Sequence, residues 1–227
     1  MTEHREIARI QVSTRSGKVR VLAEEGTQLS VEGGVVVGEE LGVVEIRRDR
    51  NSKEITIVCP AGTDLTAGTI SGSIETLGRL GSVRVASVSG KVHVTRATRV
   101  DVRSKSGAIE VDEVAGECRI VVTSAKVHIG RAQRAVIAGV SGIVTMEGVE
   151  GAEVKTVSGK VLIATQGASD VNVRTVSGRV EVTVPPDVQP STRLKSISGK
   201  VRCDCPTGHD GAISVTSVSG TIHVACA

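Results

Sequence analysis

The residues whose chemistry could hold a metal ion gather near the end of the sequence. Cys203, Cys205 and Cys226 are potential thiolate ligands for zinc, and His209 lies between them in the chain. Cys205 and Cys226 occupy equivalent positions after two Ser-Gly pairs, so they could instead form a disulfide. However, the Cys-x-Cys spacing lacks the turn of a Cys-x-x-Cys zinc knuckle, and cysteine also serves as a small core residue. We therefore expect buried thiols and no metal or other cofactor, with zinc and a Cys205–Cys226 disulfide as alternatives.

A second group of side chains could bind a polyanion. Basic residues recur two positions after the Ser of the repeated Ser-Gly (once Ser-Ala) pair, at Lys18, Lys91, Lys126, Lys160, Arg179 and Lys200. If these positions stack, they form a basic column able to contact nucleic acid, an anionic polymer or a lipid headgroup surface. The alternative interpretation is solvation, because lysine on a flat strand face also prevents edge-to-edge aggregation. We favour solvation, since neighbouring positions supply Glu75, Glu110 and Glu181.

Acidic and imidazole side chains alternate two positions further on, at Glu75, His93, Glu110 and His128. Adjacent members could interact across a ladder of strands, and histidine there could respond to pH. General acid–base catalysis would need a concave substrate site, which a flat exposed column does not offer. The sequence also contains no phosphate-binding loop, dinucleotide fingerprint, nucleophile elbow or His-Glu-x-x-His motif. We expect a protein that is not an enzyme and takes no small-molecule substrate.

Composition narrows the function further. The 227 residues include no Phe, Tyr or Trp, which removes the aromatic stacking platforms used by many sugar and single-strand nucleic-acid sites. The net charge of +3 arises from 28 basic and 25 acidic residues and argues against a strong attraction to nucleic acid. The polar N-terminal residues predict no signal peptide, and no stretch is apolar enough for membrane insertion. With five cysteines, an odd number, we expect a cytoplasmic protein in a reducing compartment.

Most of these candidate residues belong to copies of one repeated unit, Ser87-Val88-Ser89-Gly90-Lys91-Val92-His93-Val94. Near-copies continue to the C-terminus, and self-similarity at a short period is typical of a repeat fold. The position of the glycine recurs every 17 to 21 residues, at Gly72, Gly90, Gly107, Ala125, Gly142, Gly159, Gly178, Gly199 and Gly220.

Each copy predicts two short strands joined by a corner. After Ser-Gly, branched apolar residues alternate with polar ones, as Val92 and Val94 do, which indicates a half-buried strand. A second alternating segment, such as Val83–Val85, precedes the corner. Glycine tolerates the backbone of a tight corner, and Ser or Thr can bond its own backbone there. The pattern predicts an all-β, single-domain parallel β-solenoid of either hand, with each coil directly above the previous one.

The first residues are less regular. Short strands are expected at Ile7–Val12, Lys18–Leu22, Gln28–Val31, Val35–Val37, Val43–Ile46 and Ile55–Val58. We interpret residues 1–60 as an N-terminal cap with irregular first coils and residues 61–227 as the regular repeats, within one domain spanning 1–227. Proline-containing insertions at 185–190 and 206–211 should leave the sheet as loops.

Several motifs resemble a bacterial putative-adhesin family, a domain of unknown function. Val58-Cys59-Pro60-Ala61-Gly62-Thr63-Asp64-Leu65 is similar to the family's V-x-P-A-G-x-x-L entrance to its repeats, as are Leu77–Val83 and the serial Ser-Gly-x-Val copies. The resemblance covers about residues 7–227 and implies a β-solenoid. The family usually has Asp after Ser-Gly, where this sequence has mainly Lys or Arg.

Taken together, the sequence predicts a non-enzymatic structural or protein-interaction scaffold. A rod with repeated flat faces and two ends favours a protein partner or self-association, and we expect no nucleic-acid partner. The alternative is a polyanion- or envelope-binding, adhesin-like module that uses the basic column.

Overall fold

The described part of the chain consists of strands and their connections, which confirms the all-β prediction. The computed structural model describes residues 8–26, 28–40, 42–49 and 52–227. Within these residues, no helix is long and apolar enough to cross a bilayer.

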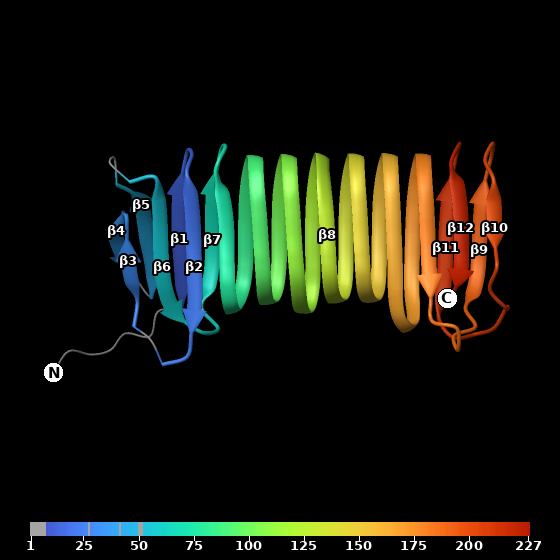
Figure 1. Cartoon of the computed structure of the whole chain (residues 1–227), viewed down its shortest axis with the longest axis horizontal. Coiled ribbons are helices and arrows are strands. Elements are labelled where there is room, and N and C mark those ends of the chain that lie inside the picture. The colour runs from blue at the N-terminus through green and yellow to red at the C-terminus, as the bar shows by residue number, and fades with distance from the viewer. Residues whose placement is uncertain (1–7, 27, 41, 50–51) are drawn as a thin grey trace.

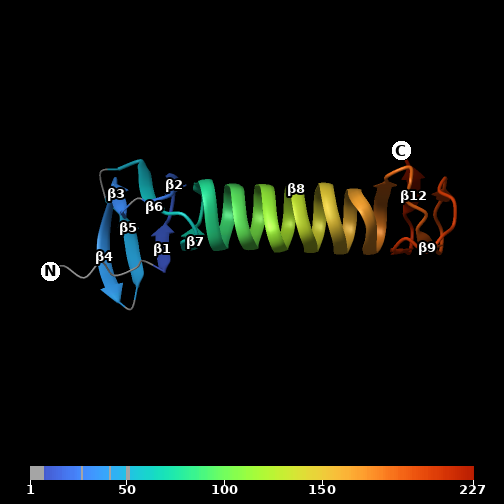
Figure 2. The same ribbon diagram turned by 90° about the horizontal axis from the view of Figure 1, so that it is seen from below.

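One exceptionally long strand winds through the centre of the molecule as a coil (Figures 1 and 2). The hydrogen-bonded ladder continues around the corners there, whereas the repeat had suggested separate short strands. The twelve strands are β1 (Arg9–Thr14), β2 (Lys18–Glu24), β3 (Ser30–Glu32), β4 (Gly34–Glu40), β5 (Val43–Arg48), β6 (Glu54–Pro60), β7 (Asp64–Thr69), β8 (Ser73–Val184), β9 (Ser191–Ser196), β10 (Val201–Cys203), β11 (Ala212–Ser217) and β12 (Thr221–Cys226).

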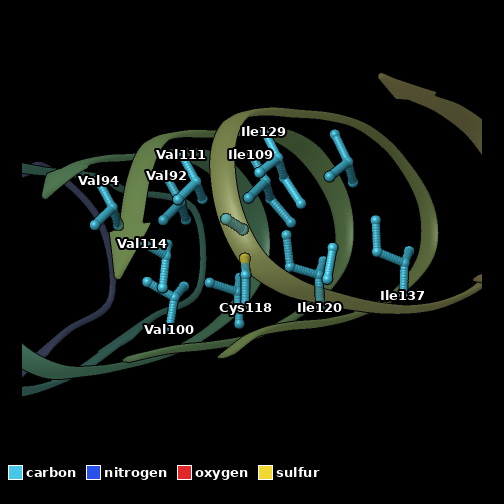
Figure 3. Close-up of a cluster of buried hydrophobic side chains, with 14 of the residues drawn as sticks. Val92, Val94, Val100, Ile109, Val111, Val114, Cys118, Ile120, Ile129 and Ile137 are labelled. Atoms are coloured by element: carbon cyan, nitrogen blue, oxygen red, sulfur yellow. The ribbon is translucent and has the colours of Figure 1, made fainter. Parts of the chain in front are cut away.

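The interior of the coil is filled by the alternating apolar residues of the repeat (Figure 3). Val92 and Val94 on one side, and Val100 and Ile120 on the other, are at most 1% exposed. Cys118 is also fully buried and takes the place of an aliphatic side chain. Burial of such apolar surface contributes about 25 cal/mol per Å² and is the main stabilising term of the fold.

Glycine occupies most corners because successive coils approach there through their backbones, although Ala125 holds the equivalent position at one corner. At Gly142, whose φ is +135°, an added Cβ would lie 2.0 Å from the carbonyl oxygen of Ala125 in the preceding coil. The same carbonyl contact faces Gly90, Gly107, Gly159 and Gly178. A side chain therefore fits neither the space nor the backbone conformation of these positions.

The serines and threonines of the corner connect the coil to itself and to its neighbour. Ser104 Oγ donates to the carbonyl of Ser106 at 2.9 Å, which is the local bond expected of a corner hydroxyl. Ser106 Oγ in turn donates to the carbonyl of Val88 in the preceding coil at 3.3 Å. The Ser-Gly signature thus combines a hydrogen bond between coils with a close backbone approach.

The order of the coils differs from the chain order at the N-terminal end, which corrects the prediction that each coil lies on the previous one. β1 and β2 lie between β5–β6 on one side and β7–β8 on the other. The chain therefore has to pass over its own first coil after Pro60. Ala61 N donates to Glu24 O and Gly62 N donates to Arg79 O, so this turn bonds the layers on both sides.

The C-terminal end contains a second exchange of order. β11 and β12 lie between the last coil of β8 and the outermost strands β9 and β10. The first proline-containing insertion carries the chain past the position of the inserted coil to the outermost one, and the second brings it back. The two insertions form hydrogen bonds with each other. Gln189 N donates to Asp210 Oδ2 at 3.1 Å, and Asp210 N donates to Gln189 O at 3.0 Å. The division into a cap at 1–60 and repeats at 61–227 remains a prediction.

Candidate functional site

The basic column becomes a mixed-charge surface in the folded chain. Lys91 Nζ lies 3.2 Å from Glu110, and Lys160 Nζ lies 3.7 Å from Glu181, in each case on the next coil. Arg179 also contacts Glu181, at 3.6 Å. Each lysine reaches a carboxylate displaced diagonally by two residues, which is within range across adjacent strands.

Two members of the column keep an unpaired charge. Among the described residues, no ion pair involves Lys126 or Lys200. The position that Lys126 would reach diagonally on the next coil is Thr145, so no acid is within the reach that the other lysines use. Lys18 is paired with Glu75 at 2.6 Å. The geometry therefore offers a polyanion isolated charges rather than a continuous stripe.

The histidines bond acids that the sequence had not singled out. His93 Nε2 lies 3.2 Å from both carboxylate oxygens of Asp112, and His128 Nε2 lies 3.8 Å from Glu147. The expected partner in the ladder, Glu110, lies beside His93, but its closest cation is Lys91. The diagonal rule that governs the lysines also selects these pairs.

Two carboxyl groups of this face have pKa values below their ordinary range. The hydrogen bond from Lys91 lowers the pKa of Glu110, with smaller contributions from the charges of Lys91, His93 and His128. The hydrogen bond from Lys18 likewise lowers the pKa of Glu75. Both groups therefore carry a negative charge at neutral pH.

The candidate zinc residues do not share one site. Cys205 and Cys226 form a disulfide, which brings the outermost coil and the inserted coil together. Cys203 is exposed and free, and His209 is exposed in the loop before β11. The equivalence of Cys205 and Cys226 visible in the sequence reflects this stacking, but two of the three thiolates are consumed by the disulfide.

The C-terminal end of the rod leaves its interior uncovered. Val201 is 44% exposed, although it is in register with Ile222, which is fully buried. Cys203 is exposed, although its register partner Val224 is also fully buried. In the part of the chain that the structure describes, the strands paired with β9 and β10 are β11 and β12, and no further coil lies on their other side.

The two ends carry opposite charges. Residues 24–40, which include β3 and β4, contain five acidic and no basic residues, at Glu24, Glu25, Glu32, Glu39 and Glu40. Residues 191–203, which include β9 and β10, contain four basic and no acidic residues, at Arg193, Lys195, Lys200 and Arg202. Figure 1 places these strands at opposite ends of the rod.

Few of the charges on these end strands form an ion pair with another described residue. Among described residues, no ion pair involves the acids of β3 and β4, and of the four bases only Arg202 is paired, with Asp204. The opposite charges of the two ends are present in the sequence but were not predicted from it. The reason is that only the order of the coils shows which strands lie outermost.

A stripe of exposed aliphatic side chains follows the corner and was also missed. Its members occupy the variable position directly before the Ser of each Ser-Gly pair and are 40–82% exposed: Ile70, Val88, Val140, Val157, Val176, Val218 and Ile197. Lys105 and Thr123 interrupt the stripe. The recurring valine before Ser-Gly was the available signal.

Comparisons with known proteins agree with the resemblance seen in the motifs. A family model described as "Toastrack DUF4097" matches residues 1–226. No curated protein gives a match. Among solved structures, a putative adhesin from Bacteroides fragilis NCTC 9343 has 13% identity and a TM-score of 0.37, with 97% of this chain and 93% of that chain covered.

A putative cell adhesion protein from Clostridium sporogenes ATCC 15579 has 10% identity and a TM-score of 0.23, with 96% and 92% covered. The family match spans nearly the whole sequence and includes both the entrance motif and the Ser-Gly repeats. The chain belongs to the Toastrack DUF4097 family.

Proposed function

We propose that this protein is a non-enzymatic scaffold that associates with further copies of itself, the N-terminal end of one rod docking on the C-terminal end of the next. The observation that carries this proposal is the opposite charge of the two ends. Three carboxylates at β3 and β4 would face three cations at β9 and β10, and none of the six forms an ion pair with another described residue. Complementary charge of this kind steers association and excludes the wrong orientation.

The backbone at both ends supports the same contact. Among the described strands, β4 pairs with β5 alone and β10 with β12 alone, so each end presents a strand edge that no described strand covers. Such edges can accept another strand. Exposed apolar side chains accompany both, Val35–Val37 at 46–51% on β4 and Val201 at 44% on β10. A contact between unlike ends repeats without closing and would produce a linear assembly.

The alternative, a polyanion-binding or adhesin-like module, has less support. Four of the six members of the basic column, Lys18, Lys91, Lys160 and Arg179, are held by carboxylates on the same or an adjacent coil. Binding to a polyanion would have to break these pairs, and the resulting weak complex should dissociate by about 0.2 M salt. Salt-resistant binding would favour this alternative.

The test is a charge exchange between the two ends. Light scattering of the wild-type protein should show a mass that rises with concentration at low salt and falls near 1 M salt, where the screening length is about 3 Å. Glu39→Lys/Glu40→Lys and Lys195→Glu/Lys200→Glu should each be monomeric. An equimolar mixture of the two variants should assemble again, because each reversed end then meets a complementary one.

The matched control is Lys126→Glu, which reverses an unpaired charge in the middle of the rod and should assemble like the wild type. A wild-type protein that stays monomeric at high concentration would refute the proposal. So would loss of assembly in the Lys195/Lys200 variant alone, which would indicate contacts between two C-terminal ends.

We also propose a cytoplasmic location, which rests on the odd number of cysteines in the sequence, five. The disulfide between Cys205 and Cys226 argues instead for an oxidising compartment, because reducing compartments keep such pairs as thiols. Thiol labelling of the protein in its native cells, before and after reduction, would decide between the two: a reduced pair supports the cytoplasm.

A further inference from the structure

One group of metal-ligating side chains lies in the middle of the rod, apart from the cysteines and from both ends. The ligand atoms of His93, Glu110 and Asp112 all lie within 4.8 Å of one another. His93 comes from one coil of β8, and the two carboxylates come from the next. All three therefore project from a continuous ladder whose position is fixed on both sides by neighbouring coils.

The charges of this group favour the binding of a further cation. Asp112 has no ion-pair partner among the described residues except His93, and Lys91 pairs with Glu110 at 3.2 Å. With a neutral imidazole, two carboxylates and one ammonium group leave one net negative charge. A dication with two carboxylate ligands would neutralise them directly and release Lys91 to solvent.

A second imidazole–carboxylate pair lacks this excess negative charge and serves as a comparison. His223 Nε2 lies 2.9 Å from Asp204, in the same diagonal arrangement as His93 and Asp112. There, however, Arg202 Nε also lies 2.8 Å from Asp204, so a cation already occupies the carboxylate. Arg202 is in register with His223, as Glu110 is beside His93. The second pair therefore has an arginine where the first has a glutamate.

Space for the rest of a coordination shell adjoins the group. A surface hollow of about 540 Å³ is lined by Asp112, by Arg131 and, two coils beyond Asp112, by Glu147, together with Arg96 and Glu113, which pair with each other. Gly130 lies between Asp112 and Glu147 and contributes no side chain. The side chains of His93 and Asp112 are 24% and 48% exposed, so both can be reached from solvent.

We propose that His93, Glu110 and Asp112 form a binding site for one zinc-class divalent ion. One imidazole nitrogen and two carboxylate oxygens would coordinate the ion at about 2.0–2.2 Å, with water in the open position. Tetrahedral coordination at this bond length needs ligand atoms about 3.4 Å apart, which side-chain rotation supplies from the present separation. The mixed nitrogen and oxygen ligands favour Zn²⁺ over Mg²⁺, which prefers oxygen ligands alone.

Calorimetric titration of the tag-free protein with Zn²⁺ tests the site. A Cys203→Ser background removes the exposed thiol, and excess Mg²⁺ in the buffer should not compete. We expect one ion per chain, with affinity lowered at least ~100-fold by His93→Gln or Asp112→Asn, since even residues behind metal ligands change affinity by 10–100-fold. His223→Gln is the matched control and should bind as tightly as the parent.

Imidazole NMR signals provide a second readout that does not depend on the calorimetric fit. Zn²⁺ should shift the His93 signal and leave the His223 signal in place, and far-UV circular dichroism should show that each variant keeps the fold. Equal loss of affinity in His93→Gln and His223→Gln, or no saturable binding, would overturn the site. This result would be independent of whether the rods assemble through their ends.

Discussion

The corner glycines make a sharp prediction, because at Gly142 two separate penalties can be calculated from the structure. Replacement by alanine would force a side chain into a backbone with φ of +135°, which costs of order 1–3 kcal/mol. The new Cβ would also lie 2.0 Å from Ala125 O, and crowding of this kind costs about 1–3 kcal/mol. We expect Gly142→Ala to lower the free energy of unfolding by about 2–6 kcal/mol.

Substitutions at two other glycines distinguish the cost of the backbone conformation from the cost of crowding. Gly62 has a φ of +85° but open space around its missing side chain, so Gly62→Ala should lose only about 1–2 kcal/mol. Gly167 has open space and no positive φ. Gly167→Ala should be neutral or stabilise by about 0.4–1 kcal/mol through the unfolded state.

Unfolding must be followed by far-UV circular dichroism, because the chain has no aromatic side chain to serve as a fluorophore. Repeat proteins can unfold in stages, so the midpoint and the steepness of the urea transition should both be compared. A Gly142→Ala protein as stable as Gly167→Ala would refute the reasoning. It would mean that the coils can separate locally, as they must already do to some degree around the natural Ala125.

Three further predictions follow from the cysteines and the charged face. Cys226→Ser breaks the disulfide and should destabilise the terminal coils by about 3 kcal/mol. Hydrogen exchange should become faster in those coils but not in the middle of β8, and unchanged exchange would contradict a stabilising role. Burial raises the pKa of Cys118 to about 12, so a thiol reagent should modify Cys203 quickly and Cys118 only after unfolding; equal rates would exclude the buried position. Lys18 lowers the pKa of Glu75 below its ordinary value of 4.5, so this contact stabilises the fold at neutral pH and is lost as the pH falls through the lowered pKa. Glu75→Gln should therefore reduce the drop in melting temperature between neutral and acidic pH, and an unchanged drop would show that the pair contributes nothing.

Much of the coil could be predicted from the sequence because its determinants are local. The alternation of Val92 and Val94 assigns the inward face of a strand without knowledge of its neighbours, and these residues are buried as expected. The equivalence of Cys205 and Cys226 also followed from counting along the repeat, although the sequence did not distinguish a disulfide from thiols. The partners of the histidines could not be obtained this way, since Asp112 is reached diagonally and only the assembled ladder shows which diagonal is used.

By itself, the sequence determined the repeat, the inward-facing residues, the Ser-Gly corners and the family. Only the tertiary structure decided which coil lies at each end. Every coil presents nearly the same apolar columns to its neighbours, so the local pattern does not specify the stacking order. The connections at residues 61–63, 185–190 and 204–211 make that choice, by carrying the chain over a coil already formed. The exposed edges and the opposite charges of the ends follow from it.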